Sequence, residues 1–298
     1  MNLRQLEYFV AIAEERSLTR AAERLLVAQP SLSQQMRSLE SEIGVPLLER
    51  LPRGVRLSTA GERFLPEARA AIEHADRARR SARMAWGLEG GELHIATIAS
   101  VAAGWLPMAL RRWQVRHPEV EISLREFMHR RSMDEAVRDG YGDLAVGLVP
   151  AQWQGPVEHL GWEEFVVVLP EGDPVLRRRS VALEELADRK WVHFAQEHGL
   201  SEIVDVCFGA SGFTPRIAVR TSQLSPAPVL AAAGLGPTLV PDTIVPEALQ
   251  PLARPLRPRR ARRIVAFARE PSPAARAFID VLHEYEWKPR PRGCIELE

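Results

Sequence analysis

The sequence predicts a protein of two parts: an N-terminal all-α winged helix-turn-helix with a long linker helix, and then a two-lobed α/β domain. Three observations predict this. Apolar residues recur at helical spacing through residues 3–43. Phe64 and six alanines then follow a 3.5-residue repeat as far as Ala85. From Gly91 onward, short apolar runs typical of strands alternate with amphipathic runs typical of helices.

The overall composition excludes several classes of protein. Of the 298 residues, 46% are hydrophobic and 26% are charged, as in ordinary globular proteins. No apolar run approaches the roughly 20 residues that cross a bilayer, and we expect no signal peptide. Only two cysteines occur, so we expect no disulfide framework and a cytoplasmic location. Residues 1–88 hold 14 Arg against 11 Asp and Glu, so a mildly basic part precedes a mildly acidic one.

Residues 1–44 carry the signals of three short helices. The first begins at Leu3, and Ser17 is a suitable N-cap for the second. Pro30 stands in the first turn of the third helix, which Gly44 ends. Two short helices joined by a tight turn are typical of a helix-turn-helix.

A small hairpin is predicted after these helices. The strand-like runs 47–50 and 55–57 flank a turn that contains Pro52 and Gly54. A hairpin in this position is the wing of a winged helix-turn-helix.

Residues 58–88 predict one long helix, capped by Ser58 or Thr59. Its apolar stripe is narrow, and Arg and Glu fill the flanking positions. A second copy of the same helix is the simplest cover for such a stripe, so we expect a homodimer. The alternative is that the helix lies on its own domain. The stripe consists of Phe64, Ala68, Ala71, Ala75, Ala78, Ala82 and Ala85.

The remaining sequence predicts parallel α/β units with helices on both faces. Strands near residues 165 and 264 are expected to cross between the two lobes. The segment 251–263, with three prolines and six arginines, is expected to be an exposed loop. The expected strands are 93–99, 120–127, 144–148, 165–169, 191–195, 217–221, 238–241 and 263–268, and the expected helices are 105–117, 132–139, 201–210, 228–233 and 274–287.

Motifs of the common enzyme classes do not occur in this sequence. It has no Walker loop, G-x-G-x-x-G, H-E-x-x-H or C-x-x-C, and no two of its eight histidines are four residues apart. The pairs Glu163-Glu164 and Glu184-Glu185 are interpreted as solvated faces, and His193 as a structural residue in a strand. We therefore predict no catalytic residue, no metal site and no cofactor.

The third short helix has the side chains that read DNA. The first turns of such a helix meet base edges in the major groove, where Gln pairs with adenine and Arg with guanine or phosphate. The alternative is an ordinary solvated helix face. The expected DNA-binding residues are Gln29, Pro30, Ser31, Ser33, Gln34 and Arg37 on the helix, and Arg50 and Arg53, with Arg56 beside them, in the wing.

Several segments together resemble the LysR-type transcriptional regulators. The resemblance is dense over residues 1–65 and looser over almost all of the remaining chain. It is carried by Leu3–Phe9, Ser17–Leu25, Gln29–Glu40, Gly44–Arg50 and Leu57–Gly61, and later by Asp139–Ala145 and Val229–Gly236.

The resemblance implies a winged helix-turn-helix over residues 1–58, a linker and dimerisation helix over 59–89, and a periplasmic-binding-protein-like effector domain over 90–298. The expected lobes are about 90–162 with 264–298, and about 163–263. It implies promoter DNA and a small-molecule effector as partners, a homodimer or homotetramer, and RNA polymerase as a candidate partner. Many members have Arg where this chain has Gln34, so one DNA contact is lost or moved.

The effector is expected in the cleft between the lobes, at the carboxyl ends of strands. Ser100, the foremost candidate, would also cap the next helix. The mixture of polar and apolar residues fits a small organic acid or amide. The expected effector-binding residues are Ser100, Val101, Phe127, His129, Phe194, Gln196, Ser222 and Gln223.

Four other interpretations stay open from the sequence alone. Cys207 allows a redox sensor, although a small core residue fits its apolar neighbours better. A regulator without an effector, including an architectural DNA binder, would have the same N-terminal part. A solute-binding protein would use only the α/β domain, and an enzyme with an added DNA-binding head would show catalytic motifs.

Overall fold

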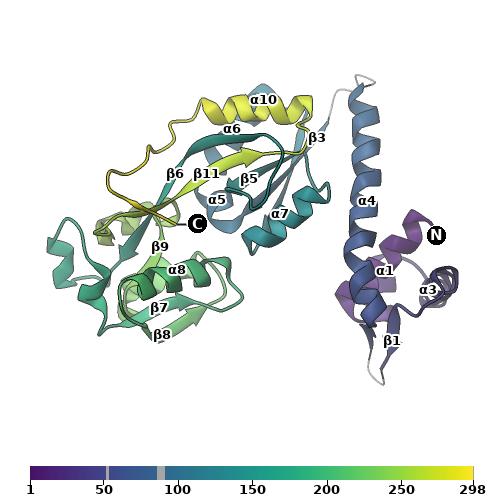
Figure 1. Cartoon of the computed structure of the whole chain (residues 1–298), viewed down its shortest axis with the longest axis horizontal. Coiled ribbons are helices and arrows are strands. Elements are labelled where there is room, and N and C mark those ends of the chain that lie inside the picture. Colours follow the sequence, from purple (N-terminus) through teal and green to yellow (C-terminus); the bar gives the residue numbers. More distant parts are fainter. Residues whose placement is uncertain (52–53, 86–90, 298) are drawn as a thin grey trace. The chain divides into compact units, whose positions relative to one another are not determined.

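The computed structural model describes residues 1–51, 54–85 and 91–297; at 50, 77 and 80–85 it describes the backbone alone. The chain forms two compact units, one built mainly on residues 1–88 and the other on residues 89–138 and 142–298 (Figure 1). No described helix is both long enough and apolar enough to cross a membrane.

The first unit begins with the three expected helices, α1 (Leu3–Glu15), α2 (Leu18–Arg24) and α3 (Gln29–Ile43). Ser17 caps α2, as predicted, because its hydroxyl accepts a hydrogen bond from the amide of Arg20. The wing follows as the antiparallel strands β1 (Leu48–Arg50) and β2 (Val55–Leu57). Gly54 has a φ of 91°, and a Cβ there would lie 2.6 Å from the carbonyl oxygen of Arg16. The wing can therefore lie against the end of α1 only with glycine at this position.

The long helix α4 (Thr59–Ala85) packs on this unit with its first half. Ala68 is buried, and the rings of Phe9 and Phe64 meet edge to face at 5.3 Å. This half of the alanine stripe thus lies on its own unit, as the alternative interpretation supposed. Ala75 is only partly buried and Ala78 is exposed, and the side chains of the last two alanines lie outside the described residues.

The second unit contains a mixed sheet, whose strands are, in order, β10 (Ala253–Pro255), β6 (Val157–Val168), β11 (Arg260–Phe267), β5 (Leu144–Leu148), β3 (Glu92–Ile98) and β4 (Glu121–Phe127). Its first lobe has parallel β3 (Glu92–Ile98), β4 (Glu121–Phe127) and β5 (Leu144–Leu148), with β11 (Arg260–Phe267) antiparallel to β5. Figure 1 shows helices α7 (Arg130–Arg138) and α10 (Pro273–His283) on opposite sides of this sheet. The helices of this lobe are α5 (Ala99–Gly104), α6 (Leu106–Arg116), α7 (Arg130–Arg138) and α10 (Pro273–His283).

The second lobe has its own core around the buried strand residues Phe165, Trp191 and Phe194. Its strands are β6 (Val157–Val168), β7 (Lys190–Phe194), β8 (Arg216–Thr221), β9 (Thr238–Pro241) and β10 (Ala253–Pro255). Its helices are α8 (Gly199–Ala210) and α9 (Pro226–Leu230), with short helical turns η1 (Pro174–Arg177), η2 (Leu183–Leu186), η3 (Ala231–Leu235), η4 (Asp242–Ile244) and η5 (Glu247–Leu252). A last short strand, β12 (Ile295–Glu296), pairs with β11.

Four expectations about this unit are wrong. The sheet is mixed, because β6 runs antiparallel to its neighbours β11, β9 and β10. The segment 251–263 is not a loop: it forms β10 and the start of β11. The start of β11 was not recognised in the sequence because of its arginines. A strand with both buried and exposed arginines has the same sequence pattern as a run of solvated charges. β6 also begins at Val157, well before residue 165, and the last helix ends at His283 rather than at 287.

Candidate functional site

Helix α3 divides cleanly into a buried and an exposed side. Leu32, Met36 and Leu39 are buried against the other helices. The opposite side exposes most of the residues expected to read DNA; Ser33 alone is half-buried and has an interaction of its own. The exposed ones are Gln29, Pro30, Ser31, Gln34 and Arg37. The N-cap position is Ala28, which provides no side-chain cap, so amides of the first turn keep their hydrogen-bonding capacity.

The wing is attached to α3 through Glu40, which sequence reasoning missed. Its carboxylate accepts hydrogen bonds from the amides of Leu47 and Leu48 at 2.8 and 3.0 Å. Within the wing, Arg56 is paired with Glu49. Arg53 lies outside the described residues, and of Arg50 only the backbone in β1 is described.

The second unit encloses a cavity of about 860 Å³ between its two lobes. Of the expected effector-binding residues, Ser100 and His129 line it. Val101, Phe127 and Phe194 are buried in the lobes, and three others are exposed outside its lining, namely Gln196, Ser222 and Gln223. The lobes approach closely beside it, since a Cβ on Gly199 would lie 2.0 Å from the carbonyl oxygen of Met128.

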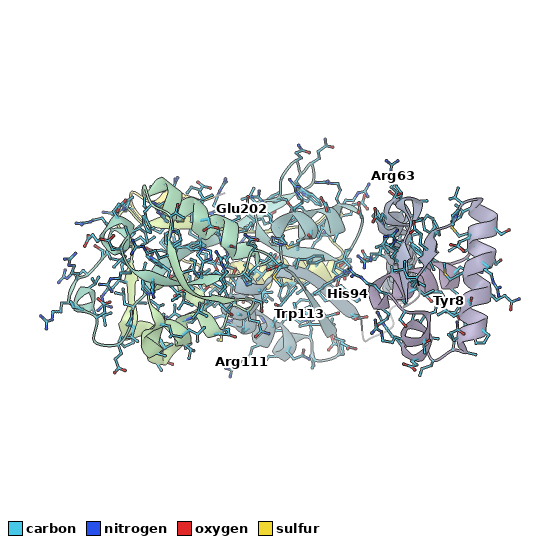
Figure 2. All side chains as sticks on the ribbon, turned by 90° about the horizontal axis from the view of Figure 1, so that it is seen from below. Tyr8, Arg63, His94, Arg111, Trp113 and Glu202 are labelled. Carbon is cyan, nitrogen blue, oxygen red and sulfur yellow. The ribbon has the colours of Figure 1, made fainter. Side chains whose placement is uncertain are left out.

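Helix α8 forms a long wall of the cavity, which the sequence analysis did not identify. Glu202 of this helix is labelled in Figure 2. Gly199, Ile203, Val206 and Ala210 line the cavity and recur at helical spacing, so they share one face. The helical periodicity of this segment was visible in the sequence; which face looks into a cavity was not.

A buried polar network holds Ser100 in place. The guanidinium of Arg262 donates to the Ser100 hydroxyl at 2.7 Å and pairs with Glu163 at 2.5 Å. Thr243 donates to the other oxygen of Glu163 at 3.0 Å, and Arg262 lies over the ring of Phe165.

Two sequence interpretations are corrected by this network. The Glu163 side chain is fully buried and therefore not solvated, whereas that of the adjacent Glu164 is more accessible. Ser100 is not an N-cap: α5 begins at Ala99 with Ile98 as its N-cap.

His198, at the start of α8, is a further polar residue of the cavity. Its Nδ1 accepts the amide hydrogen of Leu200 at 3.1 Å, so the neutral ring has its proton on Nε2. Burial, together with the neighbouring His129, lowers the pKa of His198. His193, in contrast, is a structural residue, as predicted, because Phe194 and Asp205 satisfy both of its ring nitrogens.

Cys207 is buried in the core of the second lobe, and Cys294 is half-buried. Burial raises the pKa of the Cys207 thiol to about 11, and neither cysteine is in a disulfide. The described part of the chain has no cluster of three His, Cys, Asp or Glu side chains that would hold a metal ion.

The chain is similar to known transcriptional regulators over most of its length. The family model of the LysR substrate binding domain matches residues 87–287, and that of the bacterial regulatory helix-turn-helix proteins of the lysR family matches residues 3–62. The HTH-type transcriptional regulator AlsR of Bacillus subtilis (strain 168) is 34% identical over 253 residues, 82% of this chain and 81% of AlsR. The Hca operon transcriptional activator HcaR of Escherichia coli (strain K12) is 35% identical over 246 residues, 81% of this chain and 82% of HcaR.

Solved structures agree with these relatives. CbnR, a LysR family transcriptional regulator, shares the fold with a TM-score of 0.69 at 24% identity, over 95% of this chain and 99% of CbnR. Full-length CbnR complexed with its target DNA gives a TM-score of 0.68 at 25% identity, over the same shares of the two chains. The chain therefore belongs to the LysR family of transcriptional regulators, with a helix-turn-helix domain followed by an effector-binding domain.

Proposed function

We propose that the exposed side of α3 reads base edges in the major groove of promoter DNA and that a small molecule in the cavity of the second unit modulates this binding. The observation that carries the proposal is the exposed polar side of α3, with its apolar side anchored in the domain core. Gln29 and Gln34 can each form two hydrogen bonds with adenine, and Arg37 pairs with guanine or phosphate. The structural neighbour CbnR has been solved on its target DNA, which supports this use of the domain.

The remaining parts of the proposal follow from the same arrangement. Two chains joined through the second half of α4 would present their two α3 helices to two half-sites of the DNA, as dimeric helix-turn-helix proteins do. We propose domain limits of 1–58, 59–89 and 90–298, assembly into dimers or tetramers, RNA polymerase as a candidate partner, and action in the cytoplasm. Ser100 and His129 are the proposed effector contacts that line the cavity.

A binding-site selection experiment on random duplex DNA tests the DNA-reading part. We expect the wild type to select discrete sites and Gln34→Ala to select sites with altered base preference. Gln35→Ala is the matched control, because Gln35 is half-buried and accepts a hydrogen bond from Gln5 at 3.3 Å. It should keep the wild-type preference. Selection of no discrete sites by the wild type would refute the proposed function.

A further inference from the structure

Four arginines lie within five residues at the start of β11 and alternate between its two faces. Arg259 and Arg263 are exposed on one face, whereas Arg260 and Arg262 are 4% and 3% exposed on the other. Both buried side chains line the cavity between the lobes. This alternation follows from the two-residue period of a strand.

Three of the four arginines have a carboxylate partner. Arg259 pairs with Glu164 at 3.3 Å, Arg262 with Glu163 at 2.5 Å, and Arg263 with Glu296 at 2.5 Å. Arg260 has no carboxylate within 4 Å among residues 1–51, 54–85 and 91–297. A buried guanidinium without a counter-ion is costly in free energy, so this exception calls for a function.

The polar neighbours of Arg260 are neutral. It donates to the hydroxyl of Ser211 at 2.9 Å and contacts the thiol of Cys207. The raised pKa of that thiol keeps it protonated at neutral pH, so it supplies no negative charge. The C-terminal end of α8 at Ser211 contributes only a partial negative charge.

The acidic residues of the cavity lining do not neutralise Arg260 either. These are Glu202 and Glu296. Glu296 is already shared by Arg263 and Arg290, and Glu202 is exposed and beyond ion-pair distance from Arg260. Among the described residues, which end at Leu297, the cavity thus keeps one buried positive charge that a ligand can compensate.

Helix α8 forms the surface that the rest of such a ligand would contact. Arg260 bonds to Ser211 at the C-terminal end of α8. From there the cavity-lining residues of the helix run back through Ala210, Val206 and Ile203 to Gly199. The 11 steps of this helix span about 16 Å. An apolar body lying along this face would extend from Arg260 toward His198.

We propose that Arg260 binds the carboxylate of an effector whose apolar body lies along the Ile203, Val206 and Ala210 face of α8. The inference rests on the proposed effector role of the cavity and names the chemical class and the anchoring residue. A planar guanidinium donates two parallel hydrogen bonds to the two oxygens of a carboxylate. A carboxamide of the same shape cannot accept both of these hydrogen bonds.

Thermal unfolding of the full-length protein with matched ligands tests the proposal. The probes are hexanoate and benzoate, each compared with its own amide, hexanamide and benzamide. At a concentration about a hundred times Kd, we expect a carboxylate to raise Tm by about 5 °C. We expect the amides to raise it far less.

Three variants locate the effect. Arg260→Met should weaken carboxylate binding by at least about tenfold while leaving the ligand-free Tm equal to or above the wild-type value. Arg259→Met, which removes an exposed arginine one residue away, should keep the carboxylate response. Arg262→Met should lower the ligand-free Tm sharply, because it leaves Glu163 buried without its partner.

Several outcomes would overturn the inference. These are equal stabilisation by carboxylates and amides, no response to either carboxylate, a retained response in Arg260→Met, or a loss of ligand-free stability as large as that of Arg262→Met. None of them changes DNA site selection by the wild type, so failure of this inference is distinct from failure of the proposed function.

Discussion

His198 shows how one buried imidazole links pH to the stability of the second unit. Its ring stacks on Phe194 at a centroid distance of 4.6 Å, and its Nδ1 is occupied by the amide of Leu200. Because burial and the nearby His129 lower its pKa, the folded protein resists protonation at a pH where the unfolded chain accepts a proton. This contribution to stability is complete above the unfolded pKa and is lost as the pH falls below it.

We therefore predict that His198→Asn reduces the loss of stability between pH 7 and pH 5.5. Asparagine can still accept the Leu200 amide hydrogen as an N-cap residue, so the fold is kept. The change in slope is bounded by one proton, about 1.4 kcal/mol per pH unit. Urea unfolding at a series of pH values measures it, and His159→Asn, at an exposed ring, is the control. Identical slopes for the wild type and His198→Asn would contradict the prediction.

At the scale of elements, the pair β6 and β11 joins the two lobes and carries the Glu163–Arg262 ion pair. These side chains come from neighbouring antiparallel strands and are 0% and 3% exposed. Removing one partner of a buried ion pair leaves the other charge uncompensated, which costs more than removing both.

We predict that Glu163→Gln lowers the free energy of unfolding of this unit by about 3 kcal/mol. The double variant Glu163→Met with Arg262→Met should lose less than the sum of the two single changes. Tryptophan fluorescence during urea unfolding is a suitable signal, since six of the seven tryptophans follow residue 100.

The neighbouring residue offers a control for that measurement. Burial raises the pKa of Glu164, and its Oε1 has no hydrogen-bond partner among the described residues, so Glu164→Gln should cost less than about 1 kcal/mol. Equal losses at the two positions would mean that the buried pair has no special role.

The elements that the sequence predicted well are those with a clear period. The three short helices, the wing strands and the strand of Leu144–Leu148 appear at or near the expected residues, because their apolar spacing is set by local geometry. Arg262 and Glu163 were misjudged, since a charged residue looks solvated unless its partner is known. That partner is about 100 positions away in the chain, and no local pattern reveals it.

The candidate sites divide in the same way. The exposed residues of α3 follow from helical periodicity within one segment, so most of them could be named in advance. The cavity combines β3, α5, β5, α7, α8, β11 and β12, and only Ser100 and His129 of its lining were expected. Gln196, Ser222 and Gln223 follow strands of the second lobe but are exposed, because a position after a strand does not determine where the loop turns.

At the scale of the whole molecule, a chain of zero formal net charge combines a basic first part with an acidic second part. Binding to DNA phosphates depends on where positive charge lies, and each phosphate contact contributes about 0.9 to the slope of log K against log salt concentration. Arg37 is exposed on the side of α3 that we propose to face DNA.

We predict that Arg37→Ala weakens binding to a selected DNA site and lowers the salt slope by about 0.9 for each chain bound, if the residue contacts a phosphate. If it contacts guanine instead, the slope stays near the wild-type value and the base preference relaxes at one position. Arg111→Ala removes the same charge from an exposed position on α6 of the other unit, labelled in Figure 2, and should change neither quantity. Fluorescence anisotropy titrations at several salt concentrations measure both. Equal effects of the two variants would show that overall charge, and not the α3 side, governs DNA binding.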